Sequence, residues 1–125
     1  MSSIRFRPEV TCALTVRDLK KSILWYQTVL GFDLLYEMEE MGWCEMSTHL
    51  EGVTIGLGQS AEEPIQPGGA TLVFGVDDMD QAVASLQDHG VTLDGEVRTI
   101  GNMVKLADFR DIDGNSLMLA ETLSR

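Results

Sequence analysis

Side chains able to perform chemistry are few in this chain, and they are scattered. The two cysteines, Cys12 and Cys44, each lie in an apolar stretch rather than in a Cys-x-x-Cys pair. The two histidines, His49 and His89, fall in an expected turn and at an expected helix end, where both should be exposed. The sequence holds no Ser-His-Asp arrangement, phosphate-binding loop or dinucleotide fingerprint, and the aspartates of segment 108–113 lack the spacing of a calcium loop. Covalent catalysis by a cysteine is not expected, because the acidic surroundings would not stabilise a thiolate.

A tryptophan and a glutamate form the most promising pair. Trp43 and Glu45 alternate with Cys44 and Met46 in a segment typical of a strand, so the two pairs point to opposite faces. If the apolar pair faces the core, Trp43 and Glu45 face a cavity, where they would suit a cationic or planar ligand. The alternative is that Trp43 packs at a dimer contact and Glu45 is solvated. Glu45 is also our candidate for a general base.

The charge balance limits the partners. The 125-residue chain has 20 acidic and 9 basic residues, a formal net charge of −11. Such a surface repels phosphate, which argues against nucleic acid and against anionic membranes as partners, and it attracts cations. The alternative is that the acidity serves only solubility. Apolar residues make up 44% of the chain, enough to build a core.

These candidate residues are set in a regular succession of strands and helices. Helices are expected after Asp18 and Asp78, each able to cap the helix that follows it. Gly31 and Gly90 should end these helices in a left-handed conformation. Period-two patterns and β-branched residues predict strands at 10–16, 32–37, 43–48, 53–58, 71–76, 91–97, 103–109 and 116–121.

The second half of the chain repeats the first. With an offset of 60 residues, Thr11 lands on Thr71 and Asp18 on Asp78. Each half contains a strand, a helix and three further strands. Segment 59–69 separates the halves and holds two of the three prolines. The sequence therefore predicts one α+β domain, 1–125, with a first module at about 8–58, a linker at 59–69 and a second module at about 70–122, which together form a curved mixed sheet around a cavity.

Several short motifs carry a family resemblance. They are LTVRDL at 14–19, WY at 25–26, LGF at 30–32, FGVDD at 74–78 and FRDIDGN at 109–115. Their order and spacing resemble the vicinal-oxygen-chelate superfamily, which includes glyoxalases, extradiol dioxygenases and bleomycin resistance proteins. In the last motif Ile112 stands where the family usually has proline. The resemblance covers nearly the whole chain and implies the two-module fold, but members of one fold differ widely in function.

The resemblance also locates four metal-ligand positions. In metal-dependent members these hold His or Glu, and in this chain they are Thr11, Gly56, Thr71 and Met118. A neutral hydroxyl, a glycine and a thioether are poor ligands for a catalytic divalent metal. The resemblance therefore implies that the family metal site has been lost and that no cofactor is bound.

Alternation along the strands predicts which side chains face the cavity. Tyr36 and Phe109 are aromatic walls if the pocket exists, and ordinary core residues otherwise. The alternative for the whole face is that large side chains from loops or from a partner chain fill the space. The predicted pocket residues are Thr11, Ala13, Trp43, Glu45, Thr54, Gly56, Thr71, Val73, Phe109, Ser116 and Met118.

Three functions follow from these features. The first is a metal-independent small-molecule binder of the bleomycin-resistance type, which sequesters an antibiotic or a metabolite. The second is an enzyme with an atypical site, either a lyase, an isomerase or a dioxygenase-like protein. The third is a non-catalytic dimeric regulatory module. The resemblance implies a homodimer, in which one chain can complete the other's pocket. Because segment 1–8 lacks an apolar signal-peptide run, a cytoplasmic location is expected.

Overall fold

The computed structural model describes residues 5, 7–60 and 71–123. The chain divides into two compact units, residues 1–65 and 66–125. Most of the predicted linker, 61–69, lies outside the described residues, and each module is considered by itself. No helix among the described residues is long and apolar enough to cross a membrane.

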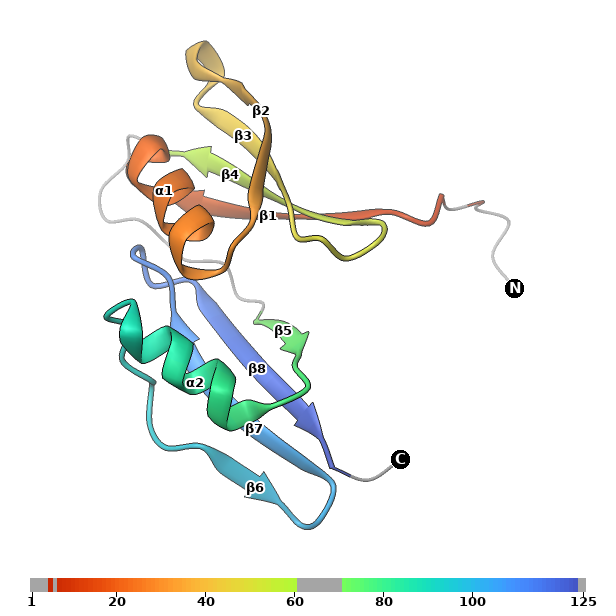
Figure 1. Ribbon diagram of the computed structural model, residues 1–125. Helices are drawn as coiled ribbons and strands as arrows, with labels where there is room; N and C mark the ends of the chain where they lie inside the picture. The colour runs from red at the N-terminus through yellow and green to blue at the C-terminus, as the bar shows by residue number, and fades with distance from the viewer. Residues whose placement is uncertain (1–4, 6, 61–70, 124–125) are drawn as a thin grey trace. The chain divides into compact units, whose positions relative to one another are not determined.

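The first module is a four-stranded mixed sheet with one long helix (Figure 1). Its strands lie in the order β1-β4-β3-β2, with β1 and β4 parallel and the other pairs antiparallel. The helix packs on β4 and β2. Its elements are β1 (Val10–Val16), α1 (Leu19–Val29), β2 (Asp33–Met38), the short 3-10 helix η1 (Glu39–Met41), β3 (Trp43–Ser47) and β4 (Val53–Gln59).

The second module has the same connectivity. Its strands lie in the order β5-β8-β7-β6, with β5 and β8 parallel, and its helix packs on β7 and β8. The α+β class and the two βαβββ modules are thereby confirmed. The elements are β5 (Leu72–Gly75), α2 (Met79–Asp88), β6 (Arg98–Ile100), β7 (Val104–Arg110) and β8 (Ser116–Thr122).

Both long helices begin and end at the residues that the sequence predicts. The Asp18 carboxylate accepts a hydrogen bond from the Lys21 backbone N–H, and Asp78 accepts one from Gln81, each at 3.1 Å. These bonds satisfy backbone donors that have no partner within the helix. The chain then leaves each helix through a glycine in the left-handed region, with φ of 74° at Gly31 and 78° at Gly90.

Alternate strand residues face the helix and form the core. Cys44 and Met46 of β3 are fully buried, as expected if they face the core. The opposite side of each sheet, which carries no helix of its own module, is called the open face below. Phe109 belongs to the core of the second module rather than to a pocket wall, because its side chain is only 1% exposed and it pairs with buried Leu117.

One predicted strand is absent. Residues 91–97 form no strand, and the short β6 begins only at Arg98. Gly95 has a φ of 95°, which interrupts the extended conformation that the apolar residues of this segment favour. The Asp94 N–H donates a hydrogen bond to the Asp108 carbonyl oxygen of β7 at 2.7 Å. This bond holds the segment in place of strand pairing.

Candidate ligand-binding site

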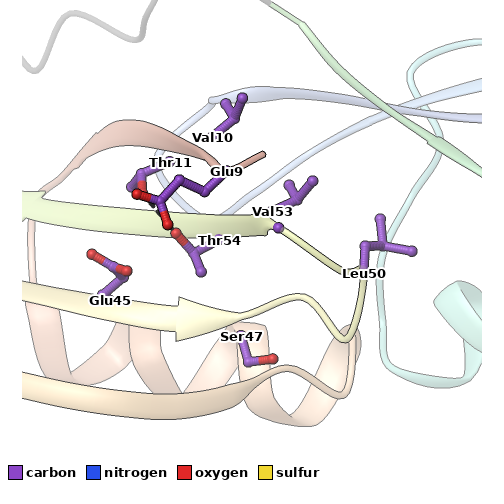
Figure 2. Close-up of a pocket in the computed structure, with 9 residues that line it drawn as sticks. Glu9, Val10, Thr11, Glu45, Ser47, Leu50, Val53 and Thr54 are labelled. Carbon is purple, nitrogen blue, oxygen red and sulfur yellow. Dashed lines mark hydrogen bonds between the residues drawn. The ribbon is translucent and has the colours of Figure 1, made fainter. Parts of the chain in front are cut away.

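The open face of the first module contains a cavity of about 630 Å³ (Figure 2). This volume is in the range of small-molecule sites. Of the pocket residues that the sequence predicts, the structure brings Thr11, Glu45 and Thr54 together around it. Among the residues that the structure describes, no basic side chain lines the cavity. The complete lining is Glu9, Val10, Thr11, Glu45, Ser47, Leu50, Gly52, Val53 and Thr54.

The strand register explains how these side chains meet. Thr54 of β4 lies between Thr11 of β1 and Ser47 of β3, so three hydroxyl-bearing residues follow one another across the sheet. The hydroxyls of Thr11 and Thr54 are hydrogen-bonded at 2.8 Å. Glu45 lies one alternation along β3 from Ser47, on the same face. The result is a polar floor with one carboxylate at its side.

The turn between β3 and β4 closes the end of the cavity. Gly52 has a φ of 76°, and its carbonyl accepts a hydrogen bond from the Val10 N–H at 2.6 Å. A Cβ atom at this position would overlap the Pro8 carbonyl oxygen. Only glycine therefore lets the turn approach the chain that enters β1.

Trp43 occupies space that the sequence assigns to a ligand. Its ring lies over Gly56 and Gly58, and a Cβ atom at Gly56 would overlap the ring atoms Cη2 and Cζ2. The small residues of β4 thus make room for a side chain of the same module, and neither Gly56 nor Trp43 lines the cavity. Ala13, which pairs with Gly56, is exposed on the open face and also lies outside the lining.

A chain of hydrogen bonds connects Trp43 to the cavity wall. The indole Nε1–H donates to the Tyr36 hydroxyl oxygen at 3.1 Å, and the Tyr36 hydroxyl donates to Glu45 Oε1 at 3.1 Å. Tyr36 comes from β2, where it pairs directly with Glu45 of β3. Glu9, the other carboxylate in the lining, forms an exposed ion pair with Arg7 at 3.5 Å. Glu45 is therefore the wall carboxylate that has neutral partners.

The remaining predicted residues lie on the open face of the second module. Ser116 and Met118 alternate with buried Leu117 and Leu119, which places them opposite the core. The Thr71 hydroxyl donates to the Ser116 hydroxyl at 2.9 Å, and Val73 is 55% exposed. Their grouping with first-module residues around one cavity stays a prediction.

The metal-ligand positions that the resemblance implies do not fit a catalytic divalent metal. Thr11 is hydrogen-bonded to Thr54, Gly56 lies under the Trp43 ring, and Met118 offers only a thioether. Within residues 5, 7–60 and 71–123, no three His, Cys, Asp or Glu side chains converge as a metal site would require.

The histidines and cysteines have local roles. His49 Nε2 lies 3.1 Å from the Gly31 carbonyl oxygen, and His89 Nδ1 lies 2.8 Å from that of Ser85. Both histidines are exposed, as the sequence predicts. Burial raises the pKa of the Cys44 thiol to about 11, so Cys44 stays protonated and unreactive at neutral pH.

The aspartates of the last turn stabilise the backbone. Asp111 Oδ1 accepts hydrogen bonds from the N–H groups of Asp113 and Asn115, and Oδ2 accepts one from Asn115 Nδ2. Gly114 has a φ of 87°, and the Asn115 side chain completes the turn. This buried network accounts for the DIDGN sequence without a bound calcium ion.

Some lining residues were not predicted from the sequence. Ser47 shares the parity of Glu45, and Glu9 shares that of Thr11, so strand alternation could have identified both. Leu50 and Gly52 lie in the β3–β4 turn, whose course alternation does not specify. Val10 and Val53 are at the ends of their strands, where the turn closes against the sheet.

Comparison with known proteins places the fold in a family. A sequence model of the Glyoxalase/Bleomycin resistance protein/Dioxygenase superfamily matches residues 10–119. The chain belongs to this superfamily. The membership confirms the family that the sequence motifs suggest, and it leaves the ligand undetermined. A search of curated protein sequences gave no significant match.

Solved structures of the superfamily resemble this one over almost their full length. A superfamily member from Sphaerobacter thermophilus DSM 20745 has a TM-score of 0.78 at 24% identity, covering 94% of this chain and 98% of the other. TnmS3, an antibiotic binding protein from Streptomyces sp. CB03234, has a TM-score of 0.76 at 26% identity, with coverages of 98% and 99%. A glyoxalase/bleomycin resistance protein from the same strain has a TM-score of 0.69 at 27% identity, with coverages of 89% and 97%.

Proposed function

We propose that this chain is a metal-independent small-molecule-binding protein that sequesters an antibiotic or a metabolite. The observation that carries the proposal is the cavity on the open face of the first module, with Glu45 in its wall. The donor set at Thr11, Gly56, Thr71 and Met118 favours binding without a metal. Similarity to TnmS3, itself an antibiotic binding protein, supports the same class of function.

The chemistry of the cavity favours a cationic ligand. Carboxylates of Glu9 and Glu45 line it together with hydroxyls, and no basic side chain of the described part of the chain does. The net charge of −11 raises the local concentration of cations around the protein. We further propose that the protein acts as a cytoplasmic homodimer.

Isothermal titration with a panel of cationic glycopeptide and aromatic antibiotics tests this function. At least one compound should release or absorb heat, and Glu45→Gln should weaken its binding about 10- to 100-fold, since a hydrogen bond to a charged group is lost. Glu40→Gln, which removes an exposed carboxylate in η1, is the control with the same change of charge. The binding function is rejected if no compound and no metabolite extract gives a signal.

A catalytic use of Glu45 is the second candidate, and its place in the cavity wall is the observation that favours it. A carboxylate beside a bound substrate can accept a proton as a general base. Metal analysis combined with glyoxalase and catechol-cleavage assays, with and without Ni, Zn, Mn and Fe(II), separates the two functions. Turnover that disappears in Glu45→Gln would support the catalytic function. Absence of turnover in every assay would favour the binding function.

A further inference from the structure

Three side chains on neighbouring strands form a hydrogen-bond chain whose direction is fixed. An indole N–H can only donate, so the Tyr36 oxygen must be the acceptor in its contact with Trp43. The phenol proton then remains for Glu45, an acceptor when ionised. The chain therefore runs from Trp43 through Tyr36 to Glu45 Oε1, and no exchange of donors can reverse it.

The first member of this chain is anchored by backbone geometry. The Trp43 ring lies directly over Gly56, where there is no room for even a Cβ atom, and reaches Gly58. Trp43 pairs with Gly58 and Tyr36 pairs with Glu45, so all the groups involved are set by the register of β2, β3 and β4. The indole N–H is thus held at one place, and it holds the phenol oxygen in turn.

The last member of the chain has one oxygen held and one available. Glu45 Oε1 accepts from Tyr36, while Oε2 has no hydrogen bond within the part of the chain that the structure describes. Glu45 lines the cavity together with the hydroxyls of Thr11, Ser47 and Thr54. Oxygen acceptors thus surround a space that no basic side chain of the described residues lines, which suits a group that carries several N–H donors and a positive charge.

From this arrangement we infer that Tyr36 and Trp43 are positioning residues, which orient Glu45 to bind a protonated amine or guanidinium group of the ligand. The inference rests on the proposed binding function and adds the chemical class of the ligand and the residues that select it. Orienting the carboxylate before binding reduces the rotamer entropy that the complex would otherwise lose. Tyr36 itself lies outside the cavity lining, so it acts through Glu45 rather than by contact.

A matched pair of small probes tests the inference. Benzamidine is a planar aromatic cation, and benzamide is its neutral counterpart of nearly the same shape. In NMR titrations, the wild-type protein should bind benzamidine at least 10-fold more tightly than benzamide, a ratio typical of one charge-assisted hydrogen bond. Glu45→Gln should remove this preference, and Glu40→Gln should leave it unchanged.

Tyr36→Phe is the decisive variant, because it keeps the ring and removes only the hydroxyl. It should lower the preference for benzamidine about 3- to 10-fold while leaving the affinity for benzamide unchanged, which a merely structural role would not do. Trp43→Phe, which removes the indole N–H, should act in the same direction and serves as the second variant if Tyr36→Phe fails to fold. Amide spectra and thermal unfolding of each variant verify folding.

Different experimental outcomes contradict the positioning role, the cation site and the proposed binding function. If Glu45→Gln removes the preference for benzamidine but neither Tyr36→Phe nor Trp43→Phe lowers it, the positioning role is overturned and the cation site stands. If benzamidine does not bind, or binds no better than benzamide, the amine or guanidinium site is overturned. Heat from the antibiotic panel would in that case still support the proposed binding function with a ligand of another class.

Discussion

Glu45 in the first module and Asp108 in the second occupy matching places in their sheets. Glu45 of β3 pairs with Gly56 of β4, and Asp108 of β7 pairs with Met118 of β8. Yet Glu45 accepts a hydrogen bond from a neutral phenol, whereas Asp108 forms an ion pair with Arg98 at 2.9 Å. Only the first module therefore keeps an uncompensated negative charge at this place on its open face.

The contacts that hold each module together are repeated much more faithfully. Thr11 and Thr54 share a hydrogen bond in the first module, as Thr71 and Ser116 do in the second. The last strand of each module also supplies a second acceptor to the start of its helix. Gln59 accepts from the Leu19 N–H at 2.8 Å, and Glu121 accepts from the Met79 N–H at 2.6 Å. The scaffold is thus conserved between the modules, while the chemistry of the open faces has diverged.

Thiol labelling gives the largest expected contrast, because both cysteines belong to the first module. Cys44 is fully buried and Cys12 only partly, so Cys44 should react with a disulfide reagent at least about 1,000-fold more slowly than Cys12. Its labelling reports opening of the first module alone. Similar rates for the two thiols in native protein would show that this module opens far more easily than its core indicates.

The pKa of Cys44 adds a pH dependence to this measurement. The native value of about 11 lies above the ordinary value of 9.0, because burial disfavours the thiolate. The resulting stability is fully present below pH 9 and is lost as the pH rises from 9 to 11, since the unfolded chain ionises first. Urea unfolding of Cys44→Ala should show less of this alkaline loss than the wild-type protein.

Glycine at position 56 is the next test of the comparison. Gly56→Ala should reduce the free energy of unfolding by about 1–3 kcal/mol, because the new methyl group overlaps the Trp43 ring and the ring must move. In the second module the residue that corresponds to Trp43 is Leu106, which pairs with Ala120 as Trp43 pairs with Gly58. No indole ring stands there, so Met118 can occupy the position that corresponds to Gly56.

Gly58→Ala is the control for this substitution. A Cβ atom there would lie 3.6 Å from the nearest Trp43 atom, an ordinary contact, so stability should change by less than about 0.5 kcal/mol. Urea unfolding of both variants measures the difference. Equal effects would mean that the Trp43 ring is not held on β4 in solution.

The second acceptors at the helix starts predict a smaller effect. Glu121→Ala should cost about 1–2 kcal/mol and Gln59→Ala about 1 kcal/mol, because a carboxylate also interacts favourably with the positive end of the helix dipole. Glu121→Gln should reduce the stabilisation that this side chain gives the second module to the amount that Gln59 gives the first. A salt concentration of 1 M should reduce the difference between the costs of Glu121→Ala and Gln59→Ala. The dipole explanation is wrong if salt leaves the two costs apart.

Most of the fold could be predicted because it depends on local signals. Asp18 and Asp78 before apolar periodic segments, and Gly31 and Gly90 after them, are sufficient to bound both helices. The prediction of a strand at 91–97 was wrong, because the apolar residues of this segment suit a strand but the turn at Gly95 prevents one.

The site was less predictable, because its key contacts cross between strands. Alternation placed Trp43 and Glu45 on the open face, but it could not show that the ring lies against Gly56 or that Tyr36 connects the two residues. These contacts depend on the register of three strands, including the irregularity between Leu34 and Tyr36 in β2. Small residues facing a sheet surface therefore do not by themselves predict an empty pocket.

The smallest expected effect lies at Asp108, and it tests the comparison most directly. Asp108→Asn breaks the ion pair with Arg98, in which both side chains are partly exposed, so it should cost less than about 1 kcal/mol. Because Arg98 already compensates the charge of Asp108, benzamidine affinity measured by NMR should stay within 2-fold of the wild-type value. Glu45→Gln removes the same formal charge from the matching strand position of the other module and should remove the cation preference. If Asp108→Asn weakened benzamidine binding as strongly, ion pairing would not be what distinguishes the two open faces.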